Sequence, residues 1–229
     1  MKLETRTPEI SVILPTDTFE TIRAVVESLR EQRCRDQIEL VIITPSRSAL
    51  APDESALAGF GGVQIVEYGE MSSLPPMRAA GVRAAAAPVV FVGETHSFPQ
   101  PGWAEAIIAT HRAPWAVVMP GIGNANPATA ISWAELVIDY GPWLQELPGG
   151  ATDRFPTWPT TYKRDALLAL GDRLPELLSQ GDGLLRALSE AGHRFYFEPA
   201  ARVAHMNVPS HGPWIRERTT AASRSRPLA

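Results

Sequence analysis

A carboxylate and an imidazole stand two residues apart at the end of an apolar run, where Val89–Val92 gives way to Gly93-Glu94-Thr95-His96. The two side chains together can bind a metal ion such as Mn²⁺. They suit Mg²⁺ less, because imidazole nitrogen is a softer ligand than carboxylate oxygen. A strand end is also where open α/β sheets bind their ligands. The alternatives are a Glu94 that is solvated or caps a turn, and a His96 that is structural.

The elements that must position this pair are short apolar runs alternating with helical patterns. The first helix is indicated by an apolar stripe at i, i+3, i+4 and i+7, and the segments Met77–Ala87 and Pro101–His111 are typical of helices. This alternation predicts an α/β fold, with a mostly parallel sheet flanked by helices. The expected strands are Ile10–Leu14, Ile38–Ile43, Val63–Val66, Val89–Val92 and Trp115–Met119.

The second half of the chain has a less regular pattern. Pro127–Leu147 is predicted as a helix with a broad apolar face, and the Pro- and Gly-rich stretch Leu147–Pro159 as a loop. Two further helices and two strands around a Glu-Pro-Ala turn are expected to follow, and residues 211–229 form a polar, arginine-rich tail. These later elements are Lys163–Leu170, Leu174–Ala191, Arg194–Phe197 and Arg202–His205.

Composition limits the class of protein. The chain has 229 residues and a formal net charge of -4, which suits one α/β domain and argues against a nucleic-acid binder. Its one cysteine, Cys34, cannot form an intrachain disulfide. The N-terminus lacks the apolar region of a signal peptide, and no stretch is long and apolar enough to cross a bilayer. We therefore expect a cytoplasmic protein; peripheral membrane contact and the oligomeric state are left open.

Three stretches in order resemble the GT-A glycosyltransferases of the family 2 type. PEISVILPTDTFETI resembles the family's first strand and Pro-Thr turn, MRAAGVRAAAAPVVFVGETH its Arg-containing helix and Asp-x-Asp strand, and the region from TYKRDALL to VAHMN its closing part. The resemblance covers roughly residues 9 to 210. It implies a single GT-A (Rossmann-like) domain over residues 1–210, with a nucleotide-binding half at 1–120 and a smaller C-terminal acceptor-side region at 121–210.

The resemblance also implies roles for individual residues. Glu94 and His96 take the place of the Asp-x-Asp pair that holds a divalent metal, Mn²⁺ rather than Mg²⁺ here, and His205 falls where the family often adds a further ligand. The expected partners are a nucleoside-diphosphate sugar and an unknown hydroxyl acceptor. The residues expected on the nucleotide and sugar-donor side are Pro15, Thr16, Asp17, Thr44, Ser46, Arg78 and Glu94. Those expected on the acceptor side are Trp158, Tyr162 and Lys163.

This sequence departs from the family pattern at functional positions. Thr44-Pro45-Ser46 replaces the acidic residues that read the nucleotide base, and Gly181 stands where the family has its catalytic base. The neighbouring Asp182 is the candidate base, or else the N-cap of the following helix. The leading hypothesis is an inverting glycosyltransferase. The alternative is a catalytically inactive GT-A-like module that binds a nucleotide, a glycan or a protein partner.

Overall fold

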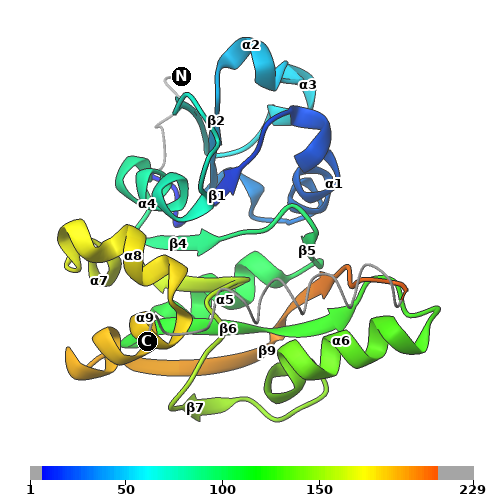
Figure 1. Cartoon of the computed structure of the whole chain (residues 1–229), viewed down its shortest axis with the longest axis vertical. Coiled ribbons are helices and arrows are strands. Elements are labelled where there is room, and N and C mark those ends of the chain that lie inside the picture. The colour runs from blue at the N-terminus through cyan, green and yellow to red at the C-terminus, as the bar shows by residue number, and fades with distance from the viewer. Residues whose placement is uncertain (1–6, 211–229) are drawn as a thin grey trace, which may run out of the picture.

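A computed structural model describes residues 7–210 of the chain, and strands of this part form one nine-stranded sheet (Figure 1). The strands are β1 (Ile10–Pro15), β2 (Ile38–Thr44), β3 (Gly62–Glu67), β4 (Val89–Val92), β5 (Ser97–Pro99), β6 (Trp115–Asn124), β7 (Gly150–Thr152), β8 (Thr160–Lys163) and β9 (Arg194–His205). Their order is β3-β2-β1-β4-β8-β6-β9-β5, and β7 pairs with β9 outside this path.

Helices connect these strands and cover the sheet. The α-helices of the described residues are α1 (Phe19–Arg30), α2 (Arg47–Leu50), α3 (Glu54–Leu57), α4 (Leu74–Ala84), α5 (Trp103–His111), α6 (Ala130–Tyr140), α7 (Arg164–Leu168), α8 (Leu174–Ser179) and α9 (Gly181–Glu190). Short 3-10 turns lie at Arg35–Gln37, Gly141–Trp143 and Gly171–Arg173.

Most strands of the sheet run in one direction. β1 is parallel to β2 and β4, β2 is parallel to β3, and β6 is parallel to β9, whereas β8 is antiparallel to both β4 and β6. Only the short strands β5, β7 and β8 run the other way. The prediction of an α/β fold with a mostly parallel, helix-flanked sheet is confirmed. The carboxyl ends of β1, β4, β6 and β9 therefore meet along one edge of the sheet.

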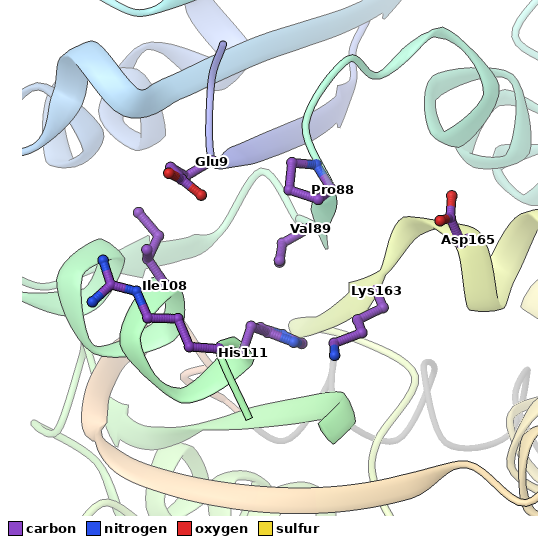
Figure 2. Close-up of a pocket in the computed structure, with 8 residues that line it drawn as sticks. Glu9, Pro88, Val89, Ile108, His111, Lys163 and Asp165 are labelled. Carbon is purple, nitrogen blue, oxygen red and sulfur yellow. The ribbon is translucent and has the colours of Figure 1, made fainter. Parts of the chain in front are cut away.

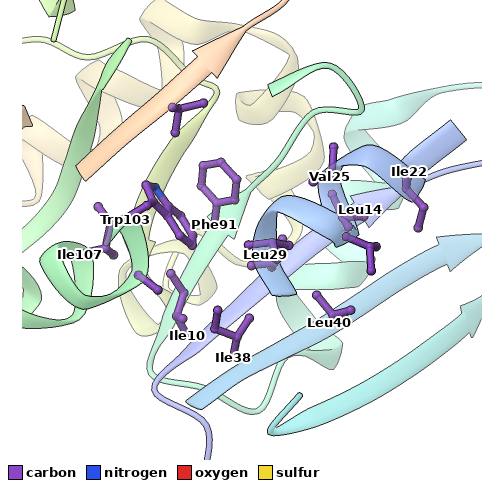
Figure 3. Close-up of a cluster of buried hydrophobic side chains, with 14 of the residues drawn as sticks. Ile10, Leu14, Ile22, Val25, Leu29, Ile38, Leu40, Phe91, Trp103 and Ile107 are labelled. Atoms are coloured by element: carbon purple, nitrogen blue, oxygen red, sulfur yellow. The ribbon is translucent and has the colours of Figure 1, made fainter. Parts of the chain in front are cut away.

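The two faces of the sheet carry separate apolar cores because successive side chains of a strand point to opposite sides. In β1, Ile10, Val12 and Leu14 pack on the face covered by α1, α5 and α6, whereas Ile13 packs with α4, α7, α8 and α9 on the other face. Burial on both faces explains why β1 and β2 are continuous apolar runs. Figure 3 shows the first core, in which Trp103 meets Phe91 edge-on, with ring centroids 4.8 Å apart.

Helix α4 lies close against β1 and β2 because residue 81 is a glycine. A Cβ at Gly81 would lie 2.4 Å from Cγ2 of Ile13 and 2.8 Å from Cδ1 of Ile43, which is too close for any side chain. This close packing fixes the position of Arg78 on the same helix, near the carboxyl edge of the sheet.

Several predicted elements of the second half were wrong in their boundaries. The helix expected over Pro127–Leu147 ends at Tyr140, where Gly141 and Pro142 follow. The helix expected over Leu174–Ala191 is two helices, separated at Gln180, which has non-helical backbone angles (φ -120, ψ 84). The two strands expected after residue 193 are one strand, β9, with a register shift against β6 between Pro120 and Gly121.

Three short strands lie where no strand was expected: β5, β7 and β8. Among them, β8 occupies Thr160–Lys163 and ends where a helix was predicted to begin, so that α7 starts only at Arg164. β6 runs through residue 120, the predicted boundary between the nucleotide-binding half and the acceptor-side region, and pairs with both β8 and β9. The two predicted halves therefore share one sheet. The predicted arginine-rich tail, 211–229, lies outside the described residues. None of the helices within residues 7–210 combines the length and apolar character needed to cross a lipid bilayer.

Candidate functional site

Glu94, His96 and His205 form a cluster at the carboxyl edge of the sheet. One ligand atom from each residue lies within 4.8 Å of the other two. Glu94 follows β4 and His96 precedes β5, while His205 is the last residue of β9. The antiparallel pairing of β5 with β9 places Ser97 opposite His205, and the backbone N–H of Met206 donates to the carbonyl oxygen of His96 at 2.9 Å. Strand pairing thus brings together residues that are far apart in the sequence.

The Glu94 carboxylate is buried but retains its charge. It accepts a hydrogen bond from Oγ of Ser97 at 2.8 Å, and its Oε2 lies 3.6 Å from Nε2 of His205. Burial alone would raise the pKa of Glu94, but the interaction with His205 and the charge of His96 outweigh it and lower that pKa. Burial would likewise lower the pKa of His205, whereas Glu94 raises it. The buried carboxylate therefore favours positive charge at the centre of the cluster.

A network of asparagines orients the imidazole of His205. Nδ1 of His205 lies 2.9 Å from Oδ1 of Asn207, while Nδ2 of Asn207 donates to Oδ1 of Asn124 at 3.1 Å and to the carbonyl oxygen of His205 at 3.2 Å. Because Oδ1 of Asn207 can only accept, Nδ1 of His205 carries a proton. Nε2, the other ring nitrogen, points to Glu94. Metal-binding histidines have the same arrangement: one ring nitrogen faces the metal and the other donates a hydrogen bond to a supporting group. No signal in the sequence distinguishes these asparagines from others.

Two cavities meet at the cluster. The first-strand cavity, about 680 Å³, is lined by Pro15, Thr16, Asp17, Thr21, Met71, Leu74, Arg78, Gly93, Glu94, Thr95, His96 and Trp158. The α6 cavity, about 570 Å³, is lined by Glu94, His96, Glu135, Asp139, Tyr140, Trp158, His205, Met206, Asn207 and Val208. Glu94, His96 and Trp158 line both, so two molecules bound in these cavities would meet beside the cluster.

Arg78 places a buried positive charge in the first-strand cavity. Its guanidinium lies 4.1 Å above the centre of the Trp158 ring, and its Nε has no hydrogen-bond partner within the described part of the chain. Burial lowers the pKa of Arg78, although the charge of Glu94 acts in the opposite direction. Because Arg78 lines this cavity, its guanidinium would attract an anionic ligand.

Asp17 lies at the exposed rim of the same cavity. Its Oδ1 accepts hydrogen bonds from Oγ1 of Thr21 and from the backbone N–H of Thr18, both at 2.8 Å. These two bonds lower the pKa of Asp17. The loop after β1 thus presents Pro15, Thr16 and a charged carboxylate, as the sequence analysis expected of a ligand-binding loop.

Three further predicted site residues serve local structure. Thr44 is fully buried, its hydroxyl pointing to the carbonyl oxygen of Ser46 at 3.5 Å, and Ser46 caps α2 by accepting from the N–H of Ala49 at 3.1 Å. Neither lines the two cavities at the cluster. Tyr162 is fully buried and donates to the carbonyl oxygen of Thr157 at 2.6 Å, so it supports the segment that carries Trp158.

The structure does not bring Lys163 to the cluster. β8 runs antiparallel to β4, so Thr160 pairs with Val92 at the Glu94 end while Lys163 pairs with Val89 at the opposite end. There Lys163 and His111 line a different cavity of about 280 Å³ (Figure 2). The resemblance implied an acceptor-side position for Lys163, but the antiparallel course of β8 carries this residue away from Glu94.

Asp182 is exposed in the first turn of α9 and lines neither cavity at the cluster. The N-cap of α9 is Gln180, so the alternative reading of Asp182 as the N-cap was wrong. The α9 terminus does approach the Trp158 segment, because a Cβ at Gly181 would lie 2.7 Å from Oγ1 of Thr157.

Solved structures resemble this architecture, although neither a family model nor a curated protein matches the sequence. A structure of GalNAc-T7 with UDP, GalNAc and Mn²⁺ has a TM-score of 0.66 at 16% identity, over 88% of this chain and 44% of that one. The mannosyltransferase PcManGT from Pyrobaculum calidifontis, in complex with GDP-Man and Mn²⁺, has a TM-score of 0.65 at 18% identity, over 98% of this chain and 67% of that one. The chain has the GT-A fold.

A further GT-A structure, residues 1–349 of TarS from S. aureus, has a TM-score of 0.58 at 16% identity, over 87% of this chain and 60% of that one. The present chain thus spans about half to two thirds of the length of these three structures. At such identities the likeness concerns the GT-A fold, and the assignment to family 2 stays a prediction.

Proposed function

We propose that this GT-A protein is an inverting glycosyltransferase, which moves a sugar from a nucleoside diphosphate to a hydroxyl acceptor with the help of a divalent cation. The observation that carries the proposal is the Glu94, His96 and His205 cluster at the junction of two cavities. The cavities provide room for two substrates, and the cluster lies where their reacting atoms would meet. The ligands of two structures of similar fold, UDP or GDP-Man together with Mn²⁺, are consistent with it.

The three side chains of the cluster fit a divalent cation. One carboxylate and two imidazoles form a donor set that suits Mn²⁺ better than Mg²⁺, which prefers oxygen ligands. The tautomer set by Asn207 leaves Nε2 of His205 available as a ligand. When bound, the cation would supply positive charge that stabilises the diphosphate as it leaves.

The first-strand cavity suits the nucleotide sugar. Arg78 provides a fixed cation for the diphosphate. Trp158 provides an aromatic face for the sugar, and its ring position is held by the guanidinium of Arg78. We assign Asp17 and Thr16 to the end of this cavity that would hold the nucleoside. We assign the base-proximal role to these loop residues rather than to Thr44 and Ser46, whose hydroxyls are engaged locally.

The α6 cavity suits the acceptor. It shares Trp158, Glu94 and His96 with the first-strand cavity, so a hydroxyl bound there would lie next to a sugar bound in the first-strand cavity. An inverting transfer requires that this hydroxyl attacks the anomeric carbon from the side opposite the diphosphate. Attack from that side inverts the configuration at the anomeric carbon.

A turnover screen tests the proposal. The purified protein is incubated with UDP- and GDP-sugars, with Mn²⁺, Mg²⁺ or EDTA, and release of the nucleoside diphosphate is measured with water as acceptor. We expect release in Mn²⁺ and none in EDTA, and NMR of the freed sugar should show the anomer opposite to that of the sugar donor. Binding of a nucleoside diphosphate without release from any sugar donor would instead support the inactive binding module.

A further inference from the structure

We propose that Asp139 on α6 accepts the proton of the acceptor hydroxyl. The inference rests on the proposed function and names a residue that the sequence alone did not suggest. Asp139 lines the α6 cavity together with the cluster and with Trp158. Its position in the fold, its exposure and the roles of the neighbouring carboxylates support this assignment.

The reaction defines where the proton acceptor must be. The acceptor oxygen forms a bond to the anomeric carbon, while the bond from that carbon to the diphosphate oxygen breaks and its electron pair leaves with the nucleoside diphosphate. The acceptor's O–H bond breaks in the same process, and its proton passes to a carboxylate oxygen of Asp139. The proton acceptor therefore has to lie on the acceptor side, in the α6 cavity, within hydrogen-bond reach of the incoming hydroxyl.

Helix α6 turns Asp139 towards this cavity. The buried residues of the helix are Ser132, Glu135, Leu136 and Tyr140, which define its inner side. Asp139 lies four residues after Glu135, so the two side chains are stacked on one flank of the helix, and both line the cavity. Tyr140 follows directly, with its hydroxyl 3.4 Å from Nε2 of His205 and its ring centroid 4.8 Å from that of His205. The residue after Asp139 thus contacts the cluster itself.

The other carboxylates that line the α6 cavity, those of Glu94 and Glu135, are buried. Glu94 is buried within the cluster. Glu135 is only 5% exposed, and its carboxylate accepts a hydrogen bond from the backbone N–H of Val208. Asp139, in contrast, is exposed, so an incoming acceptor can reach its carboxylate.

The hydroxyl of Tyr140 is a poor alternative base, because a phenol is protonated at neutral pH. Tyr140 is also buried, and its hydroxyl lies 3.4 Å from Nε2 of His205.

The test compares Asp139→Asn with a second carboxylate variant, Asp182→Asn. Release of the nucleoside diphosphate is measured with the sugar nucleotide that the wild-type protein hydrolyses, with water as acceptor, and the affinity for Mn²⁺ with that nucleoside diphosphate is measured by calorimetry. We expect Asp139→Asn to lower kcat about 100-fold or more, the scale of a lost general base, with unchanged affinity. Asp139→Glu should regain part of the rate. Asp182→Asn should stay within about threefold of the wild type.

Two results would overturn the inference while leaving the proposed function intact. One is an Asp139→Asn variant that turns over at the wild-type rate; the other is a loss of rate in Asp182→Asn but not in Asp139→Asn. A wild-type protein that binds Mn²⁺ and the nucleoside diphosphate but hydrolyses no sugar nucleotide would overturn the proposed function, and the inference with it.

Discussion

Asn207 is expected to control the affinity of the cluster for its cation without touching that cation. Its Oδ1 fixes the proton on Nδ1 of His205 at 2.9 Å, and its own amide is held by Asn124 at 3.1 Å. Asn207→Ala removes the acceptor, so Nδ1 of His205 loses its partner in a buried position. The imidazole can then rotate or change tautomer, and Nε2 no longer points reliably to Glu94.

The expected size follows from this geometry. Removing a supporting group of a metal-bound histidine weakens metal affinity about 10- to 100-fold, which corresponds to about 1.4–2.7 kcal/mol. Isothermal titration with Mn²⁺ at fixed pH measures the change directly, and circular dichroism confirms that the variant is folded at the titration temperature.

A matched variant separates orientation of the histidine from anchoring of the loop. Oδ1 of Asn126 accepts a hydrogen bond from the backbone N–H of Asn207 at 2.8 Å, and its Nδ2 donates to the Asn207 carbonyl oxygen at 2.6 Å. Both bonds go to the Asn207 backbone, and neither involves the imidazole of His205. Asn126→Ala should therefore destabilise the loop yet weaken Mn²⁺ binding less than Asn207→Ala. Wild-type Mn²⁺ affinity in Asn207→Ala, or an equal loss in both variants, would refute the orienting role of Asn207.

Two further predictions concern stability. Burial lowers the pKa of His111 from 6.5 to about 4, so the folded state binds fewer protons than the unfolded state between these values. The contribution of His111 to the free energy of unfolding is therefore complete above about pH 6.5 and falls as the pH drops towards 4. Urea unfolding should show a loss of about 2.5 kcal/mol at pH 4.5. A His111→Gln variant that keeps the full pH dependence would contradict this. Gly81→Ala should cost about 1–3 kcal/mol in the same assay, because its Cβ would lie 2.4 Å from Cγ2 of Ile13. The control Gly141→Ala should be nearly neutral, because its Cβ would meet Cγ1 of Val137 at 3.8 Å, an ordinary contact distance. Equal stability of the two glycine variants would show that α4 shifts at no cost.

The parallel part of the sheet could be predicted because its signal is local. The strands at Ile10, Ile38 and Val89 are apolar on both faces, and the stripe of α1 has the helical period, so residue type alone indicates them. The location of Glu94 and His96 at a strand end follows from the same pattern.

The remaining errors arise from interactions that are distant in the sequence. β8 is short and takes its place between β4 and β6 through pairing. Its residues Thr160, Thr161 and Tyr162 favour a strand, but four residues are too few to show a strand period. The resemblance placed Lys163 on the acceptor side, whereas the antiparallel course of β8 puts it at the opposite end of the sheet. The roles of Asn207 and Asp139 depend on β9 and α6 lying side by side at the sheet edge, as the bond between Val208 and Glu135 shows. Such side chains are ordinary until the fold assembles their partners.

The central claim is that Glu94, His96 and His205 hold a divalent cation that joins a nucleoside diphosphate to this edge of the sheet. Its most direct test is isothermal titration of the protein with UDP and with GDP, in the presence of Mn²⁺ or EDTA. Glu94→Ala combined with His96→Ala is the test variant, and Lys163→Ala, at the far end of β8, is the control. The account predicts Mn²⁺-dependent binding in the wild type and in Lys163→Ala, and its loss in the double variant. Unchanged binding in the double variant would contradict it.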